Sequence, residues 1–169
     1  LSGSMETKDL VDADGKPAER LDVVKEVVGE FLTKREGDRV ALLVFGNAPF
    51  LQVPFTQDLE LCRTLLDETQ VRMAGPRTML GDAIGKSVQL FKASELEEKV
   101  LILLTDGNDT GSLVEPTKAA QIASKEGIVI HSIAMGDPKS TGEGKFDEKT
   151  LKEVSKISGG RYFRAMDRD

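Results

Sequence analysis

Short runs of aliphatic residues alternate along the chain with segments in which apolar residues recur every three or four positions. Runs that are apolar at nearly every position are typical of strands covered on both faces, whereas the wider spacing is typical of helices with one apolar face. The runs predict strands at residues 39–45, 50–55, 99–105, 128–135 and 161–164. The spaced segments predict helices at residues 20–34, 59–66, 79–91, 116–126 and 146–158.

This order of elements predicts an α/β fold with three layers: a Rossmann-like, doubly wound, mostly parallel sheet with helices on both faces. Pro49 and Pro54 accompany the run at 50–55, and proline cannot donate to a central ladder of hydrogen bonds. We therefore expect one short antiparallel strand at the sheet edge. Because no repeat, linker or low-complexity tract divides the sequence, we expect a single domain over residues 1–169.

The composition narrows the class of protein. Hydrophobic residues make up 39% of 169, a share consistent with a soluble globular domain. The 29 acidic residues outnumber the 23 basic ones, and the net charge of −6 argues against binding to nucleic acid. No stretch approaches the roughly 18 consecutive apolar residues of a membrane span. The single cysteine, Cys62, cannot form an internal disulfide, and we expect it to pack as a small hydrophobic residue.

Candidate chemistry lies where ligands bind in open α/β sheets, in the loops beyond the carboxyl ends of the strands. Ser2 and Ser4 stand at the start of the chain, Thr78 stands at the entry to the helix from residue 79, and Asp106 follows the strand at 99–105. All four offer hard oxygen donors, and none is histidine or cysteine. Such a set suits Mg²⁺ or Mn²⁺ better than zinc.

Each of these residues also has a purely structural interpretation. Thr78 would serve equally as the N-cap of the helix that follows it, and Asp106 with Gly107 would form an ordinary turn after a strand. The first residues, before Met5, have the composition of a cloning linker. Asp82 and Asp109 are either supports for the metal or ordinary first-turn and loop carboxylates.

Three further features favour structural roles. Residues 12–15 resemble the start of a calcium loop, but Pro17 and Ala18 occupy later ligand positions, so we expect a surface turn. His131 lies in a buried strand with no acid near it in sequence, which favours a histidine satisfied by local hydrogen bonds. The glycines at 142–144 match neither phosphate-loop pattern, which favours a solvent loop.

The order and spacing of these residues resemble the metal-ion-dependent adhesion site of von Willebrand factor A (VWA) domains, whose pattern is Asp-x-Ser-x-Ser, then Thr, then Asp. Ser2, Ser4, Thr78 (within residues 75–83) and Asp106 (within residues 103–107) match its last four members. Residues 20–25, 38–45, 127–133 and 158–163 look most like the bacterial aerotolerance (Bat) type of VWA protein.

The sequence departs from this family pattern at its start. The leading Asp of the pattern would stand immediately before Leu1, and the hydrophobic strand that lies centrally in the family's sheet would precede it. The resemblance therefore implies an N-terminally truncated VWA domain, with one site carboxylate and the first central strand missing. We expect the natural polypeptide to contain earlier residues that supply both.

The resemblance implies a domain without enzymatic activity that binds an acidic side chain of a partner protein through Mg²⁺ or Mn²⁺. We expect the loops at 5–18, 46–49 and 109–116 to form the rim that selects partners. The family further implies a parent protein of the bacterial inner membrane with this domain on the periplasmic side, and as partners other VWA proteins or a MoxR-type AAA+ ATPase system.

The alternative is an Mg²⁺-dependent hydrolase or phosphoryl-transfer enzyme on a similar sheet, because fold does not fix function. Such an enzyme would place two or more acids at the end of one central strand. Here Asp106 stands there alone, with Asp109 a turn further on.

Overall fold

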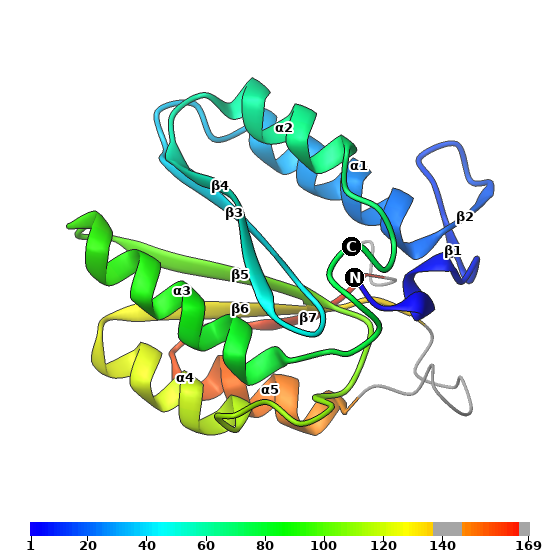
Figure 1. Ribbon diagram of the computed structural model, residues 1–169. Helices are drawn as coiled ribbons and strands as arrows, with labels where there is room; N and C mark the ends of the chain where they lie inside the picture. Colours follow the sequence, from blue (N-terminus) through cyan, green and yellow to red (C-terminus); the bar gives the residue numbers. More distant parts are fainter. Residues whose placement is uncertain (137–146, 166–169) are drawn as a thin grey trace. The chain divides into compact units, whose positions relative to one another are not determined.

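The computed structural model describes residues 1–136 and 147–165, and the chain divides into two compact units. The N-terminal unit spans Leu1–Pro76 and the C-terminal unit spans Arg77–Asp169. Figure 1 shows the elements of both. In the described residues, no helix combines the length and the apolar composition needed to cross a membrane.

The N-terminal unit contains a 3-10 turn, two antiparallel strand pairs and two helices. In chain order these are η1 (Gly3–Glu6), β1 (Leu10–Val11), β2 (Pro17–Ala18), α1 (Arg20–Thr33), β3 (Val40–Phe45), β4 (Pro49–Thr56) and α2 (Leu59–Asp67). The predicted helices and strands of this unit are thus confirmed to within about two residues. The β1–β2 ribbon was not predicted, and it closes through the turn expected at residues 12–15, where the Gly15 amide donates to the Asp12 carbonyl at 3.0 Å.

The core of this unit forms where the two helices, which lie side by side, meet the β3–β4 hairpin. Leu32 of α1, Val53 of β4 and Cys62 of α2 are buried together. Cys62 is 1% exposed, so its predicted role as a small hydrophobic residue is confirmed, and burial raises the pKa of its thiol. Asp58 caps α2 by accepting a hydrogen bond from the Leu61 amide at 2.9 Å, which fixes where this helix begins.

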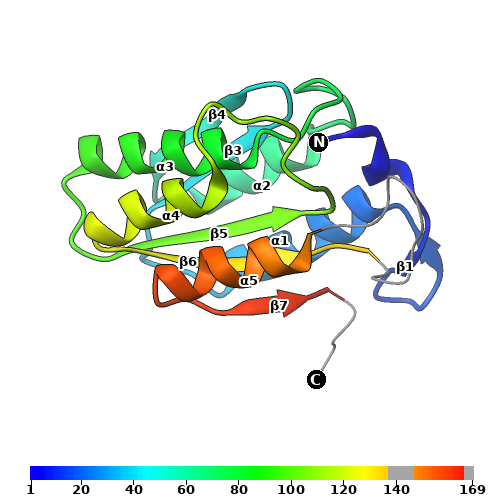
Figure 2. The same ribbon diagram turned by 90° about the horizontal axis from the view of Figure 1, so that it is seen from below.

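The C-terminal unit is a three-stranded parallel sheet with three helices. Its elements are α3 (Leu80–Ser94), β5 (Lys99–Thr105), α4 (Pro116–Lys125), β6 (Ile128–Ala134), α5 (Glu148–Ile157) and β7 (Tyr162–Arg164). The strand order is β5–β6–β7, and both neighbouring pairs are parallel. Helices α3, α4 and α5 lie side by side, and α4 and α5 pack on β6 (Figure 2).

The α/β class predicted from the sequence is confirmed, with two differences in detail. Hydrogen bonds within the described residues group the strands into three separate sheets, so the proline-bearing strand β4 pairs antiparallel with β3 alone. Helix α5 begins at Glu148 rather than at residue 146, because the Asp147 side chain accepts from the Thr150 amide at 3.1 Å and caps the helix there. The glycines at 142–144 lie outside the described residues.

The structural interpretation of His131, which is half-buried on β6, is confirmed by its hydrogen bond. Its Nδ1 accepts a hydrogen bond from the Arg161 amide at 3.0 Å, between β6 and the start of β7. Below it, the buried hydroxyl of Ser155 on α5 lies 2.8 Å from that of Ser132 on β6. These polar contacts fix α5 against the sheet and leave both serine hydroxyls satisfied.

Candidate metal site

The two predicted serine ligands lie together in the N-terminal unit. Ser2 precedes turn η1 and Ser4 lies within it, and their Oγ atoms are 2.5 Å apart. The turn holds this arrangement because the Met5 amide donates to the Ser2 carbonyl and the Thr7 amide donates to the Ser4 carbonyl. Ser2 is 8% exposed and Ser4 is half-buried, so the pair of hydroxyls is partly withdrawn from bulk water.

The serine turn is attached to the rest of its unit at both ends. At its start, the Arg72 amide donates to the Leu1 carbonyl at 2.8 Å. At its end, the Arg20 amide donates to the Thr7 carbonyl at 3.0 Å. The Arg20 guanidinium, 1% exposed, also forms a two-pronged ion pair with Asp9, with Nε–Oδ1 at 2.8 Å and Nη2–Oδ2 at 2.5 Å. Bidentate geometry of this kind fixes orientation as well as distance.

Thr78 lies in the C-terminal unit, two residues before α3 begins. It is not the N-cap that the structural alternative required, because α3 starts at Leu80 and its N-cap position is Met79. Thr78 instead makes two backbone contacts with Thr110: its amide donates to the Thr110 hydroxyl at 2.9 Å, and its carbonyl accepts from the Thr110 amide at 3.0 Å. Thr78 is 7% exposed.

Asp106 follows β5 directly and is 3% exposed. The next residue, Gly107, brings the turn after β5 against the threonine, since a Cβ built on Gly107 would lie 3.0 Å from the Thr78 Oγ1. A glycine at this position therefore leaves room for the Thr78 hydroxyl. Within the C-terminal unit, the structure thus brings Thr78 next to the segment that carries Asp106.

Asp109 caps α3 from a distant loop. Its Oδ1 accepts from the amides of Leu80 at 2.9 Å and Gly81 at 3.3 Å, and from the Ser112 hydroxyl. Its Oδ2 accepts from the amides of Gly111 at 3.1 Å and Ser112 at 3.0 Å. Burial acts to raise the pKa of this carboxyl, but the hydrogen bonds prevail and hold the pKa below its ordinary value.

The loop after Asp109 packs tightly on the first turn of α3. The Ser112 hydroxyl accepts from the Gly81 amide at 2.9 Å, and the Val114 amide donates to the Asp82 carboxylate at 3.3 Å. A Cβ on Gly81 would lie 1.8 Å from the Val114 carbonyl oxygen, so only glycine fits there. Sequence reasoning left Asp82 and Asp109 as either metal supports or ordinary carboxylates. Both prove to anchor this loop to α3.

The donor atoms of the predicted site fit a hard divalent cation. Three hydroxyls and one carboxylate are all oxygen donors, and Ser2, Thr78 and Asp106 are all buried. Within residues 1–136 and 147–165, no group of three or more His, Cys, Asp or Glu residues is arranged to hold a metal.

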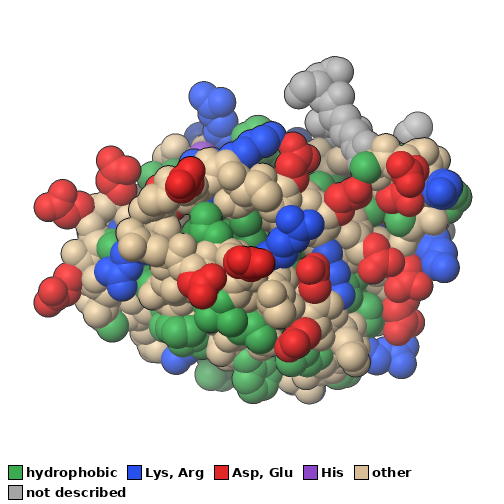
Figure 3. Space-filling model, turned by 90° about the horizontal axis from the view of Figure 1, so that it is seen from above, with side chains coloured by type: hydrophobic (Ala, Val, Ile, Leu, Met, Phe, Trp, Pro, Cys, Tyr) green, Lys and Arg blue, Asp and Glu red, His purple; other side chains and the backbone are tan. Residues whose placement is uncertain are grey.

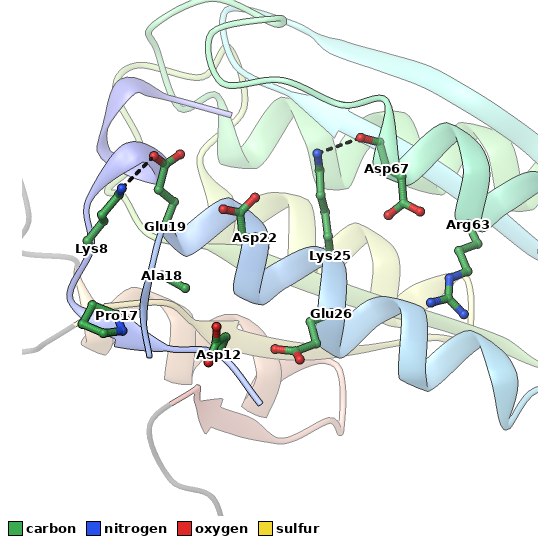
Figure 4. A pocket seen from close by; sticks show the side chains of 10 residues that line it. All are labelled: Lys8, Asp12, Pro17, Ala18, Glu19, Asp22, Lys25, Glu26, Arg63 and Asp67. Carbon is green, nitrogen blue, oxygen red and sulfur yellow. Dashed lines mark hydrogen bonds and ion pairs between the residues drawn. The ribbon is translucent and has the colours of Figure 1, made fainter. Parts of the chain in front are cut away.

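Two hollows in the described residues are lined by charged side chains that bond to protein neighbours. The larger, of about 500 Å³, lies in the N-terminal unit beside α1 (Figure 4). Its charged side chains engage neighbours, as when Lys8 pairs with Glu19 at 3.7 Å and the Lys25 Nζ donates to the Asp67 carbonyl at 2.8 Å. The smaller, of about 220 Å³, lies in the C-terminal unit between Asp109 and Asp147, whose carboxylates accept the capping bonds described above.

Side chains of both charges are exposed on the surface. Figure 3 shows acidic and basic side chains interspersed on the face that it draws, rather than a continuous basic stripe. The fold and donor set together define an α/β protein with oxygen donors suited to a hard cation.

Comparison with known proteins identifies the family. The model of the von Willebrand factor type A domain matches residues 1–169, and the chain belongs to this family. An uncharacterized membrane-spanning protein from Vibrio fischeri is 35% identical, with 100% of this chain and 88% of that chain covered and a TM-score of 0.54. An aerotolerance-related membrane protein from Bacteroides fragilis is 23% identical, with 96% and 86% covered and a TM-score of 0.83. The resemblance to Bat-type VWA proteins is thereby confirmed at the level of fold.

Two further relatives bear on length and metal. An uncharacterized protein of Borreliella burgdorferi is 26% identical over 163 residues, which are 88% of this chain and 48% of that protein. The chain thus spans about half the length of this curated relative. Proximal thread matrix protein 1 from the mussel byssus, 20% identical over 86% of this chain and 36% of that one with a TM-score of 0.69, has been solved with a zinc-occupied adhesion-site motif. VWA domains are generally interaction modules that hold a divalent metal.

Proposed function

We propose that this protein is a divalent-metal-dependent protein-interaction domain. Ser2, Ser4 and Thr78 hold Mg²⁺ or Mn²⁺ directly, and Asp106 holds it directly or through water. The observation that carries the proposal is the approach of the Ser2 and Ser4 hydroxyls to 2.5 Å in a partly buried turn. Neighbouring oxygen ligands of an octahedral cation lie about 3 Å apart, so a small opening of this pair would accommodate one.

The partner chemistry follows from the charge of the donors. Three neutral hydroxyls and one carboxylate leave a divalent cation short of negative charge, and when bound the cation supplies an open position for an anionic oxygen. An Asp or Glu side chain of a partner protein supplies that oxygen. The four residues include no histidine, lysine or cysteine, the commoner general bases and nucleophiles of enzymes, which supports binding rather than catalysis.

The loops at 5–18, 46–49 and 109–116 form the rim that selects the partner. The parent protein belongs to the bacterial inner membrane with this domain on the periplasmic side, and its partners include other VWA proteins or a MoxR-type AAA+ ATPase system. The support for the membrane is the naming of the Vibrio fischeri and Bacteroides fragilis relatives as membrane proteins. The single domain over residues 1–169 rests on the length of the chain and on its lack of a linker or repeat, and the ATPase partner rests on the family resemblance.

The proposal is tested by thermal unfolding with EDTA, Mg²⁺ or Mn²⁺. At about one hundred times its Kd, a bound ion adds about 2.7 kcal/mol, which raises the melting temperature by several degrees. Thr78→Val keeps the shape of the side chain and removes the ligand oxygen, so it should abolish the metal-induced shift. Thr33→Val, an exposed threonine on α1, should leave the shift intact. An unchanged melting temperature for the wild type at millimolar metal would contradict the proposal.

A crystal grown with Mn²⁺ gives the direct test. Anomalous scattering should locate one ion with the oxygens of Ser2, Ser4 and Thr78 about 2.1 Å away. A panel of phosphatase and nucleotidase substrates tests the enzymatic alternative. Metal-dependent turnover that Asp106→Ala abolishes would overturn the assignment as a binding domain.

A further inference from the structure

Leu113 is a large apolar residue whose side chain is exposed to solvent. It is 95% exposed, whereas the other exposed large hydrophobic residues in the described part of the chain lie between 36% and 52%. It lies in the loop between β5 and α4, next to Val114, which is itself 36% exposed. Isolated apolar residues are common on protein surfaces, so exposure alone assigns Leu113 no role.

The loop that displays Leu113 is held rigidly. On its N-terminal side, the Asp109 carboxylate accepts from the amides of Gly111 and Ser112 and from the start of α3. On its C-terminal side, the Val114 amide donates to Asp82, and the Val114 carbonyl abuts Gly81. A side chain presented by so constrained a backbone loses little conformational entropy on binding.

The same loop is tied to the proposed metal site. Thr110 exchanges two hydrogen bonds with Thr78, at 2.9 Å and 3.0 Å, so one network fixes the backbone of a proposed metal ligand and the stem of the Leu113 loop. The stem of the Leu113 loop therefore lies beside Thr78, within reach of a partner that binds there. A contact between this partner and Leu113 would remove apolar surface from water next to a charged contact, which is the arrangement of interface hot spots.

We infer that Leu113 is an apolar anchor for the partner. The partner that fits is a protein segment presenting one carboxylate to the metal and one large aliphatic or aromatic side chain to Leu113. The inference rests on the proposed function, because the carboxylate contact places the partner beside this loop. It goes further by adding an apolar requirement that the metal site alone does not impose.

The test uses the full chain and a displayed library of random peptides of about 12 residues as the probe. Peptides are selected in Mg²⁺, eluted with EDTA and resynthesised. They should contain an acidic residue and a large apolar residue at a constant spacing. Leu113→Ala should weaken binding of such a peptide about tenfold or more. Replacing the peptide's apolar residue with Ala should do the same, with little further loss when both changes are combined.

Two variants separate this inference from the proposed function. Ile122→Ala, an exposed apolar residue on α4, should leave affinity within about twofold. Thr78→Val should abolish binding of every selected peptide. Metal-dependent binding that is equal for the wild type and Leu113→Ala would overturn the apolar anchor and leave the proposed function standing. A failure to select any EDTA-eluted peptide would overturn both. Unchanged melting of Leu113→Ala confirms that a loss of affinity is not a loss of folding.

Discussion

The two units hold their proposed metal-binding segments in different ways. In the N-terminal unit, the serine turn is attached by hydrogen bonds to the backbone at each end and by the partly buried ion pair between Arg20 and Asp9. In the C-terminal unit, five hydrogen bonds converge on the single carboxylate of Asp109. The first arrangement leaves the two hydroxyls bonded to each other, whereas the second fixes the backbone around Thr78. The ion pair between Arg20 and Asp9 thus positions the proposed metal-binding segment of the N-terminal unit. In the C-terminal unit, the Asp109 carboxylate positions the corresponding segment by accepting several hydrogen bonds.

Among the variants that test this comparison, Arg20→Ala should lose the most unfolding free energy. Removing the buried Arg20 leaves the partly exposed Asp9 carboxylate without its partner, which should cost about 2–3 kcal/mol of unfolding free energy. Arg35→Ala is the matched control, since the Arg35–Asp38 pair is exposed and 3.8 Å apart and should contribute at most about 1 kcal/mol. Denaturant unfolding of both variants measures the difference. Equal losses would show that burial of the ion pair does not matter.

Gly81→Ala should have a slightly smaller effect. It should lower the free energy of unfolding by about 2 kcal/mol, because the new Cβ would collide with the Val114 carbonyl oxygen. Gly85→Ala lies one turn further along α3, where a Cβ meets no atom within 4 Å. That control should gain about 0.5–1 kcal/mol from the better helix propensity of alanine. Opposite signs in the unfolding free energies are the expected result, and a neutral Gly81→Ala would contradict the close packing of loop and helix.

Asp109→Asn should cost about 2 kcal/mol, because an amide cannot accept hydrogen bonds on both sides as the carboxylate does. Asp82 accepts a hydrogen bond from the Val114 amide at 3.3 Å. Asp82→Asn keeps an acceptor oxygen for this bond and should therefore cost less. The effect should also depend on pH. The folded pKa of Asp109 lies below its ordinary value of 3.8, so its contribution is complete above that value and is lost as pH falls through the folded pKa. The wild type and Asp109→Asn should therefore converge in stability under strongly acidic conditions and differ at neutral pH.

The smallest effect on stability should come from Ser4→Ala. Without metal, losing a hydroxyl that bonds to another hydroxyl should change the unfolding free energy by about 1 kcal/mol or less. In Mg²⁺, however, the variant should lose the metal-induced rise in melting temperature. Ser87→Ala, which removes a buried hydroxyl bonded to the Ala83 carbonyl at 2.9 Å, should keep that rise. A Ser4→Ala variant that still responds fully to metal would exclude this hydroxyl as a ligand.

The sequence pattern predicted the elements with an apolar signal and missed those without one. The continuous run at 99–105 matches β5 residue for residue, and Asp58 marks the start of α2 as expected. The β1–β2 ribbon was missed because strands of two residues are too short to show a periodicity. The pairing of Asp9 with Arg20 and the capping of α3 by Asp109 were missed for another reason. Both depend on which side chains the fold brings together, 11 and 29 positions apart, and neither spacing has a sequence signature.

For the candidate site, the structure brings the Ser2 and Ser4 hydroxyls within 2.5 Å of each other, and their binding of a metal stays a prediction. The N-cap alternative for Thr78 was wrong because the cap comes from the side chain of Asp109, in a loop that sequence reasoning could not position. The Thr78 side chain therefore does not cap α3, although its position just before the helix suggested that it would.

The close approach of Gly81 to Val114 also bears on how this domain could diversify. The stem of the loop is fixed by contacts that tolerate almost no change at Gly81, Asp109 or Ser112, whereas the tip at Leu113 touches solvent. Variation confined to the tip would alter what the loop recognises without disturbing the scaffold. The loop therefore has the organisation of an antibody hypervariable segment, and foreign recognition sequences grafted at Leu113 should be carried at little cost to folding.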